Sequence, residues 1–204
     1  MMAIAMLATA PAGGAAPPTG ALTPQESIEL AHGQTVERPQ LVEHGGERLV
    51  GGVTYTIVNA TPAELESVLD AVPSYESILP YTKSATLLAR IDDDAIVALR
   101  QGNALVDAGY ALRIRKDARA GEVRFWLDRA RPHDIADAWG FFRVTPLPDI
   151  AGVPRSLVTY GILVDIGPGL IRTLFESKIR NVVLTVPQRL RGYLAKRTET
   201  RVAR

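Results

Sequence analysis

Apolar and polar residues alternate with a period of two from residue 82 to residue 166, and this pattern constrains the fold most. Such alternation is typical of antiparallel strands that turn one face to a dry core and the other to water. In one stripe Tyr110 shares its face with Ala108 and Leu112, whereas Arg113 and Arg115 point the other way. Turns rich in Asp, Gly and Pro separate the strands. The predicted strands are 83–91, 95–102, 104–116, 121–130, 138–146 and 156–166.

One long helical pattern follows these strands, and it is the only predicted element that can cover their dry face. It runs from Pro168 to about Arg197 with a broad apolar side. Ile171, Phe175 and Ile179 are spaced by four and therefore share one helix face. A proline in the second half of the pattern should kink the helix. The sequence thus predicts an α+β fold, with a curved antiparallel sheet of about seven strands wrapped round a long C-terminal helix.

Two short helices are predicted between the first strand of this sheet and the rest. A β-branched run over 48–59 predicts that first strand. Thr61 and Glu64 then form a capping box with proline at the first helical position. Pro73 ends this helix, and a second helical turn over 75–79 follows. We expect the two helices to close the open end of the sheet.

The first 22 residues carry no charge, and their apolar start resembles the hydrophobic part of a secretory signal. The basic beginning of such a signal is missing, so a disordered linker rich in Ala and Pro is the alternative. The signal-like reading predicts an exported protein, periplasmic or extracellular. The linker reading leaves a cytoplasmic location as the alternative.

A small extension is expected between this segment and the main domain. Thr23 begins a capping box that predicts a short helix to about His32. Pro39 then marks residues 34–44 as an edge strand. The expected divisions are 1–22, a signal-like or disordered segment; 23–47, the helix and edge-strand extension; 48–197, the main domain; and 198–204, a tail.

Composition argues against several classes of function. The chain has no cysteine, and His32, His44 and His133 are far apart, so we expect no metal site and no cofactor. Aromatic residues make up 6% of the chain and do not lie among the basic residues, so we expect no nucleic-acid partner. Residues 168–204 hold nine Lys/Arg against two Asp/Glu. This basic helix either presents a solvated face or makes transient contact with an anionic membrane surface.

Several short motifs, taken in order, resemble the START-related SRPBCC superfamily, and within it the polyketide-cyclase and coenzyme-Q-binding branch. The resemblance covers about residues 48–197 and implies the helix-grip fold, in which the sheet and the last helix enclose a hydrophobic cavity. The family usually has an aromatic residue about five positions after its first helix start, and this chain has none there. The matching residues are Thr61–Glu64, Leu69-Asp70 with Tyr75 and Leu79-Pro80, Trp139–Val144, Leu157–Tyr160, Lys178–Arg180 and Val186–Leu194.

This fold predicts binding or transfer of a hydrophobic small molecule, such as a lipid, quinone, hopanoid or sterol. The segment 73–81 resembles the lid of the cavity, or else it plugs the end of the sheet. Tyr110 is expected to bring a hydroxyl into the dry space, paired with Tyr160 or with the polar head of a ligand. The expected ligand-binding residues are Tyr75, Leu79, Tyr81, Val106, Tyr110, Phe125, Leu127, Phe142, Tyr160, Ile162, Ile171, Phe175 and Ile179.

The alternative is an enzyme of the cyclase or dehydratase type that acts on a hydrophobic or aromatic substrate, which the resemblance permits. Such chemistry needs an acid or base inside the cavity. The candidates are Asp107, Tyr110, His133 and Asp134. Asp107 is predicted to face outward, and the two residues after Pro132 are predicted to lie in a solvated turn. We therefore assign no catalytic residue and rank a non-catalytic binder first.

Overall fold

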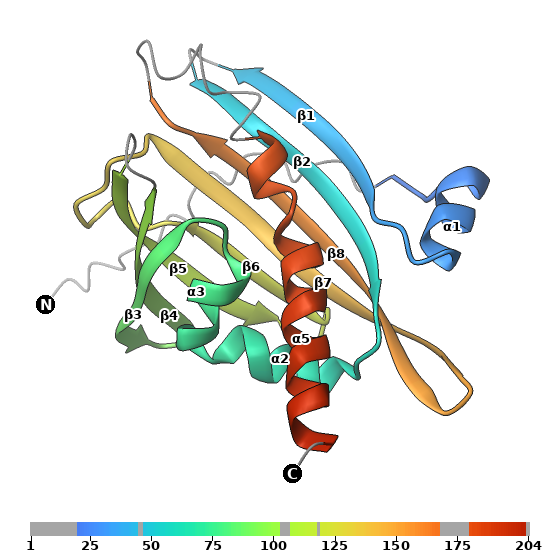
Figure 1. Cartoon of the computed structure of the whole chain (residues 1–204). Helices are drawn as coiled ribbons and strands as arrows, with labels where there is room; N and C mark the ends of the chain where they lie inside the picture. Colours follow the sequence, from blue (N-terminus) through green and yellow to red (C-terminus); the bar gives the residue numbers. More distant parts are fainter. Residues whose placement is uncertain (1–19, 45–46, 103–106, 118, 168–179, 203–204) are drawn as a thin grey trace, which may run out of the picture.

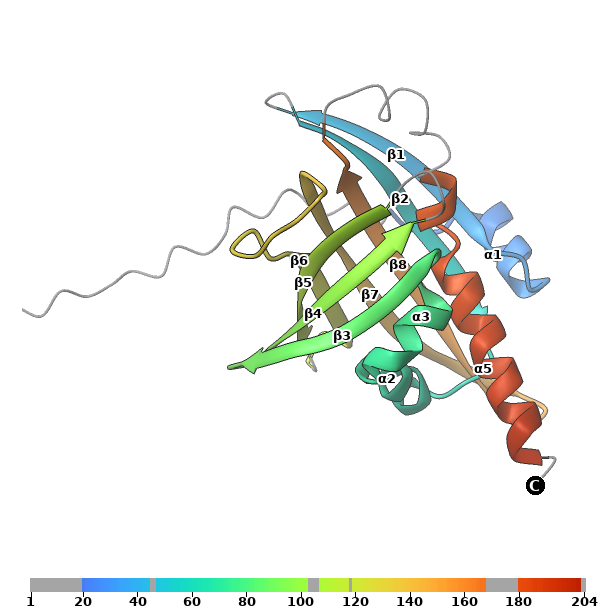
Figure 2. The ribbon, with the colours of Figure 1, turned by 60° about the vertical axis from the view of Figure 1, so that its left-hand side comes forward.

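The computed structural model describes residues 20–44, 47–102, 107–117, 119–167 and 180–202. Within these residues, eight strands form one antiparallel sheet in the order β1-β2-β8-β7-β6-β5-β4-β3 (Figure 1). The sheet is strongly curved, and helices α2, α3 and α5 lie on its concave side (Figure 2). The elements are α1 (Pro24–Ala31), β1 (Val36–His44), β2 (Glu47–Val58), α2 (Pro62–Asp70), a 3-10 turn (Val72–Ser74), α3 (Tyr75–Ile78), β3 (Thr82–Ile91), β4 (Asp94–Gly102), β5 (Asp107–Asp117), β6 (Glu122–Leu127), β7 (Asp137–Ile150), β8 (Val153–Asp165) and α5 (Val186–Val202).

The predicted α+β arrangement is confirmed, with one strand more than the seven expected for the sheet. The additional strand is β1, which pairs with β2 along its full length and forms one edge of the sheet. Its helix α1 begins at the predicted capping box, in which Thr23 and Glu26 each accept a backbone hydrogen bond from the other. Leu30 of α1 packs with Val53 and Tyr55 on the convex side of the sheet.

Two regions show the clearest differences from the predicted strand boundaries, the end of β6 and the hairpin of β7 and β8. β6 ends at Leu127 because Asp128 turns the chain and accepts a hydrogen bond from the backbone N–H of Ala130. The hairpin of β7 and β8 is longer than expected, since its turn is only Ala151 and Gly152, with φ of 51° and 76°. Such a pair of positive φ values is typical of the two-residue turns that match strand twist.

The predicted C-terminal helix is interrupted just before its proline. Residues 180–183 are helical, 184–185 form a turn, and α5 begins at Val186. Pro187 has no N–H to donate to the preceding turn, which weakens the helix at this point. The Thr54 hydroxyl of β2 donates to the carbonyl of Leu184 at 3.1 Å, in the turn where the helix is interrupted. The earlier part of the predicted helix, residues 168–179, lies outside the described residues.

Helix α5 is attached to the sheet by apolar and polar contacts. Val186, Leu190 and Leu194 are spaced by four and are buried against the concave face. Arg191 donates to the carbonyl of Gly33 at 2.8 Å, which links α5 to the end of α1. In the part of the chain that the structure describes, no helix has both the length and the apolar character needed to cross a membrane.

The convex face of the sheet carries buried carboxylates that are paired with arginines. Glu122 lies between Arg124 and Arg143, each 2.6 Å away. Burial alone would raise the pKa of Glu122, but the hydrogen bonds from the two guanidinium groups outweigh it and the pKa is lowered. Asp94 and Asp128 are paired in the same manner. The outward charges of the alternating pattern therefore pair with one another and leave the concave face apolar.

Thr54 provides a test of how α5 is held. Thr54→Val keeps the shape of the side chain but removes the hydroxyl that donates to the Leu184 carbonyl. We expect the free energy of unfolding to fall by about 1–3 kcal/mol, because a buried acceptor loses its partner. Chemical denaturation measures the change. Thr86→Val on the exposed surface of β3 should change it by less than about 0.5 kcal/mol, and an equal effect of both variants would contradict this role.

Candidate functional site

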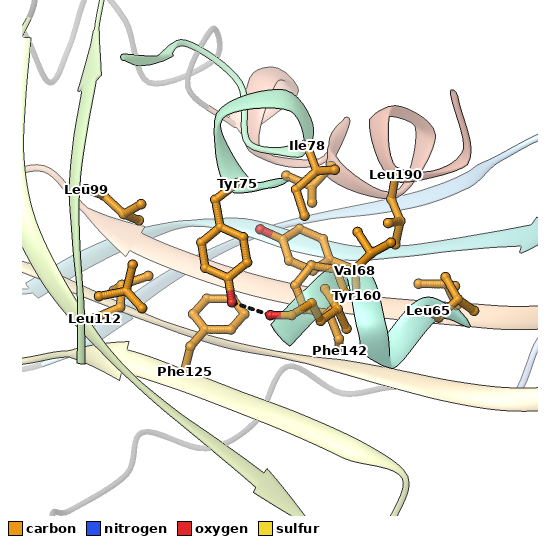
Figure 3. Close-up of a cluster of buried hydrophobic side chains, with 14 of the residues drawn as sticks. Leu65, Val68, Tyr75, Ile78, Leu99, Leu112, Phe125, Phe142, Tyr160 and Leu190 are labelled. Carbon is orange, nitrogen blue, oxygen red and sulfur yellow. Dashed lines mark hydrogen bonds between the residues drawn. The ribbon is translucent and has the colours of Figure 1, made fainter. Parts of the chain in front are cut away.

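The concave face of the sheet and the helices above it form one cluster of apolar side chains, here named the interior cluster. Leu65 and Val68 of α2, Ile78 of α3 and Leu190 of α5 contribute from the helices (Figure 3). The strands contribute every second residue, as the alternation predicts. The inward residues of β4–β8 in this cluster are Val97, Leu99, Ala108, Tyr110, Leu112, Ile114, Val123, Phe125, Leu127, Ala138, Phe142, Val144, Val158, Tyr160, Ile162 and Val164.

Three aromatic rings from neighbouring strands lie at the centre of this cluster. Phe142 and Tyr160 have ring centroids 4.6 Å apart, and Phe125 lies 6.1 Å and 6.2 Å from them. These separations lie in the range in which aromatic pairs attract beyond simple burial. The ring of Phe125 occupies the position above Gly140, where a Cβ would overlap the ring. Glycine at this position therefore allows the three rings to meet.

The segment 73–81, interpreted from the sequence as a lid or a plug, is tied to α2 by buried hydrogen bonds. The Ser74 hydroxyl donates to the carbonyl of Val68 at 2.6 Å. The Tyr75 hydroxyl donates to the carbonyl of Leu69 at 2.7 Å (Figure 3). Both bonds satisfy carbonyls near the end of a helix, which otherwise lack partners. Tyr75 therefore presents its ring to the interior, while its hydroxyl is used to hold the corner between α2 and α3.

Tyr110 faces the interior as predicted, but its hydroxyl has a partner that the sequence analysis did not consider. It donates to the side-chain carbonyl of Gln101, the inward residue near the end of β4. The amide of Gln101 in turn donates to the carbonyl of Pro80 at 3.1 Å and to the Thr82 hydroxyl at 2.9 Å. A small polar network thus connects the end of the α3 segment to the sheet. The strand parity of Gln101, which it shares with Leu99, was the signal that could have indicated it.

Tyr110 combines a deep position with a partly accessible surface. Burial raises the pKa of its hydroxyl above the ordinary value, so the group lies away from bulk water. The residue nevertheless retains part of its surface accessible to solvent. The Tyr110 side chain is therefore deep in the fold and yet not fully covered by its neighbours.

Eight of the predicted ligand-binding residues lie in the interior cluster. Val106, Ile171, Phe175 and Ile179 lie outside the described residues. Tyr81 is 56% exposed, and its backbone has a φ of 55°, in the left-handed region. The carbonyl of Tyr81 accepts a hydrogen bond from the N–H of Gly102 at 2.9 Å. The eight residues in the cluster are Tyr75, Leu79, Tyr110, Phe125, Leu127, Phe142, Tyr160 and Ile162.

The other acid–base candidates lie outside the interior cluster. Asp107 is paired with Arg100 and Lys83, and Arg100 holds the pKa of this carboxyl below its ordinary value. Asp134 is exposed and accepts a hydrogen bond from the N–H of Gly109 at 2.7 Å. His133 is exposed, and its Nδ1 lies 2.8 Å from the carbonyl oxygen of Ile135. Among the residues that the structure describes, no group of His, Asp and Glu side chains is arranged to hold a metal ion.

Comparison with known proteins identifies the fold. No family model matches the chain, and no curated protein matches its sequence. A START superfamily protein from Mycobacterium smegmatis has a TM-score of 0.58 at 15% identity, over 72% of this chain and 97% of that one. A STAR-related lipid transfer protein from Xanthomonas axonopodis has a TM-score of 0.56 at 15% identity, over 77% of this chain and 98% of that one.

An aromatase/cyclase named Zhui from a Streptomyces species is equally similar. Its TM-score is 0.56 at 15% identity, over 79% of this chain and 96% of that one. The chain therefore has the helix-grip fold of START-related proteins, which confirms the fold that its sequence motifs implied. At this identity the similarity concerns the fold, which is shared by a lipid transfer protein and an aromatase/cyclase.

Gly140 provides a test of the aromatic centre. In Gly140→Ala the new methyl group would overlap the Phe125 ring and the carbonyl oxygen of Gly161. We expect a loss of at least about 3 kcal/mol in the free energy of unfolding, at or above the upper end of the usual cost of overpacking, because one of the colliding groups is backbone.

The matched control is Gly192→Ala on the exposed side of α5, where a Cβ meets nothing within 4 Å. This change should leave stability unchanged or raise it by up to about 1 kcal/mol. If Gly140→Ala were as harmless as the control, the three rings would not be packed as described.

Proposed function

We propose that the protein binds an apolar small molecule between the concave face of the sheet and helices α2, α3 and α5. The observation that carries this proposal is the set of inward side chains that pack against the interior cluster yet keep accessible surface. Leu79, Ala108, Tyr110, Ile114 and Ile162 have this property. An interior packed without space would leave such positions fully buried.

The structural neighbours support the same general role. One is described as a lipid transfer protein and another as an aromatase/cyclase. Both descriptions concern apolar or aromatic molecules, which matches the composition of the interior cluster. A lipid, quinone, hopanoid or sterol would each be compatible with such a lining.

Binding without catalysis is the reading we favour over cyclase-type chemistry. In the described part of the interior cluster, the groups that can donate a proton are tyrosine hydroxyls, and burial raises the pKa of Tyr75, Tyr110 and Tyr160. A general acid or base works best with a pKa near the operating pH. The raised pKa values instead favour hydroxyls that remain protonated and act as hydrogen-bond donors.

Ala108→Phe tests the proposal directly. Ala108 is inward and partly accessible, so a phenyl ring there should occupy the proposed binding space. We expect the affinity for the uncharged dye Nile red to fall at least about tenfold, while the free energy of unfolding changes by less than about 1 kcal/mol. Fluorescence titration and chemical denaturation give the two values.

The control is Ala98→Phe, which adds the same ring at an outward position of β4 and should not change dye affinity. If Ala108→Phe destabilised the protein by about 1–3 kcal/mol, as overpacking of a filled core does, the space would be absent and the proposal would be wrong.

A contact of α5 with anionic membranes is proposed as the route by which such a ligand is exchanged. Arg189, Lys196 and Arg197 are exposed on α5, and residues 180–197 include no Asp or Glu. Basic side chains near an anionic lipid surface contribute about 1 kcal/mol each to binding. Export of the protein, which the uncharged N-terminal segment suggests, is likewise a proposal.

Vesicle sedimentation tests this contact. Replacement of Arg189, Lys196 and Arg197 by Gln should weaken binding to phosphatidylglycerol vesicles by about 100-fold and should not change binding to phosphatidylcholine vesicles. The matched variant replaces Arg90, Arg100 and Arg119, which are exposed on other elements. Equal losses in the two variants would show that net charge, rather than α5, determines vesicle binding.

A further inference from the structure

Tyr110 and Tyr160 from the sheet, and Tyr75 from the corner between α2 and α3, face the interior. They differ in whether the hydroxyl has a hydrogen-bond partner. Tyr75 donates its hydroxyl hydrogen to the Leu69 carbonyl, and Tyr110 donates to Gln101. Tyr160 is 1% exposed, and none of the described residues forms a hydrogen bond with its hydroxyl. Among the described residues, the buried side-chain polar atoms without a partner are Gln40 Oε1 and Arg180 Nε, and the Tyr160 hydroxyl is not one of them. The small accessible surface of Tyr160 therefore includes its hydroxyl, which can bond to a molecule in the adjoining space.

The ring of Tyr160 is fixed in position by its neighbours. It lies on the central strand β8 and packs against Phe125 and Phe142 at centroid distances of 6.2 Å and 4.6 Å. Figure 3 shows it with Phe125 and Phe142 in the interior cluster, to which Tyr75 and Ile78 also belong. The strand pairs with β2 and β7 on both sides, which fixes the backbone that carries this ring. Its hydroxyl is therefore held inside the proposed binding space.

The described inward strand positions around Tyr160 carry no charge that could hold an ionised ligand group. The described inward residues of β4–β8 are uncharged, except for Lys116 at the end of β5. Lys116 is paired with Asp70 at the end of α2 and is exposed at the rim. A carboxylate or phosphate beside Tyr160 would lose its hydration without gaining a cation, which is strongly unfavourable.

We propose, as a refinement of the function proposed above, that Tyr160 donates a hydrogen bond to an uncharged oxygen of the ligand. The expected ligand is thus an apolar molecule that places a ketone or a similar neutral acceptor deep in the interior. A molecule that would have to place a charged group there is not expected to bind. Tyr160 determines specificity, while Tyr75 and Tyr110 use their hydroxyls to hold the protein itself together.

Three naphthalene derivatives of nearly equal shape serve as probes: ethylnaphthalene, acetylnaphthalene and naphthoate. Their affinities are measured at pH 7 by displacement of Nile red from the intact protein. Tyr160→Phe should reduce the affinity for acetylnaphthalene about two- to tenfold relative to ethylnaphthalene, which corresponds to one net hydrogen bond. Naphthoate should bind at least about tenfold more weakly than acetylnaphthalene to the wild-type protein.

Tyr75→Phe is the matched control, because it removes the hydroxyl of a buried inward tyrosine whose partner lies within the protein. It should lower stability and leave the ratio of the acetyl and ethyl affinities unchanged. The inference is overturned if Tyr160→Phe also leaves this ratio unchanged, or if naphthoate binds as tightly as acetylnaphthalene. If neither Nile red nor any of the three probes binds, the proposed function fails as well, and the two failures are thereby distinguished.

Discussion

The apolar concave face of the sheet is the constraint on which the rest of the structure depends. Strands that alternate between polar and apolar residues produce one such face, and water must be kept from it. The chain meets this requirement with three helices of very different length, α2, α3 and α5. Each of them is anchored to the sheet or to another helix by buried polar contacts as well as by apolar packing. These anchors locate the helices over the sheet while the interior remains apolar.

The polar anchors lie where backbone groups lack helical partners. Thr54 donates to the carbonyl of Leu184 at the break before Pro187. Tyr75 and Ser74 donate to carbonyls near the end of α2. Each bond compensates a carbonyl that the helix itself leaves unsatisfied. Tyr160 differs from these residues, because its ring packs against Phe142 while no helix carbonyl of the described residues accepts a hydrogen bond from its hydroxyl.

The features that the sequence predicted well are those that depend on neighbours within a few residues. The capping boxes at Thr23 and Thr61 are formed by residues three positions apart, and both are present in the structure. The inward stripes of β5 and β8 follow from strand parity, which a local pattern contains. The sheet has one strand more than the seven expected, because the predicted edge strand over 34–44 joins it as β1.

The features that the sequence did not predict depend on the relative positions of strands. The bond between Tyr110 and Gln101 requires the pairing of β4 with β5, which the alternation alone does not specify. The long hairpin of β7 and β8 was expected to end earlier because prolines usually interrupt strands. Beyond Arg143 the hairpin extends past β6, so a proline there removes no hydrogen bond to that neighbouring strand. The hydrogen-bond partners of the Tyr75 and Tyr110 hydroxyls likewise became visible only in the folded chain.

Native mass spectrometry of the intact protein tests most directly whether the interior binds an apolar molecule. The account predicts a one-to-one adduct with an uncharged apolar compound, either retained through purification or acquired on incubation with acetylnaphthalene. After organic extraction of this compound, the measured mass should be that of the protein chain without the adduct. A protein that carries no adduct and acquires none, or one that binds several copies without a defined stoichiometry, would contradict a single enclosed site.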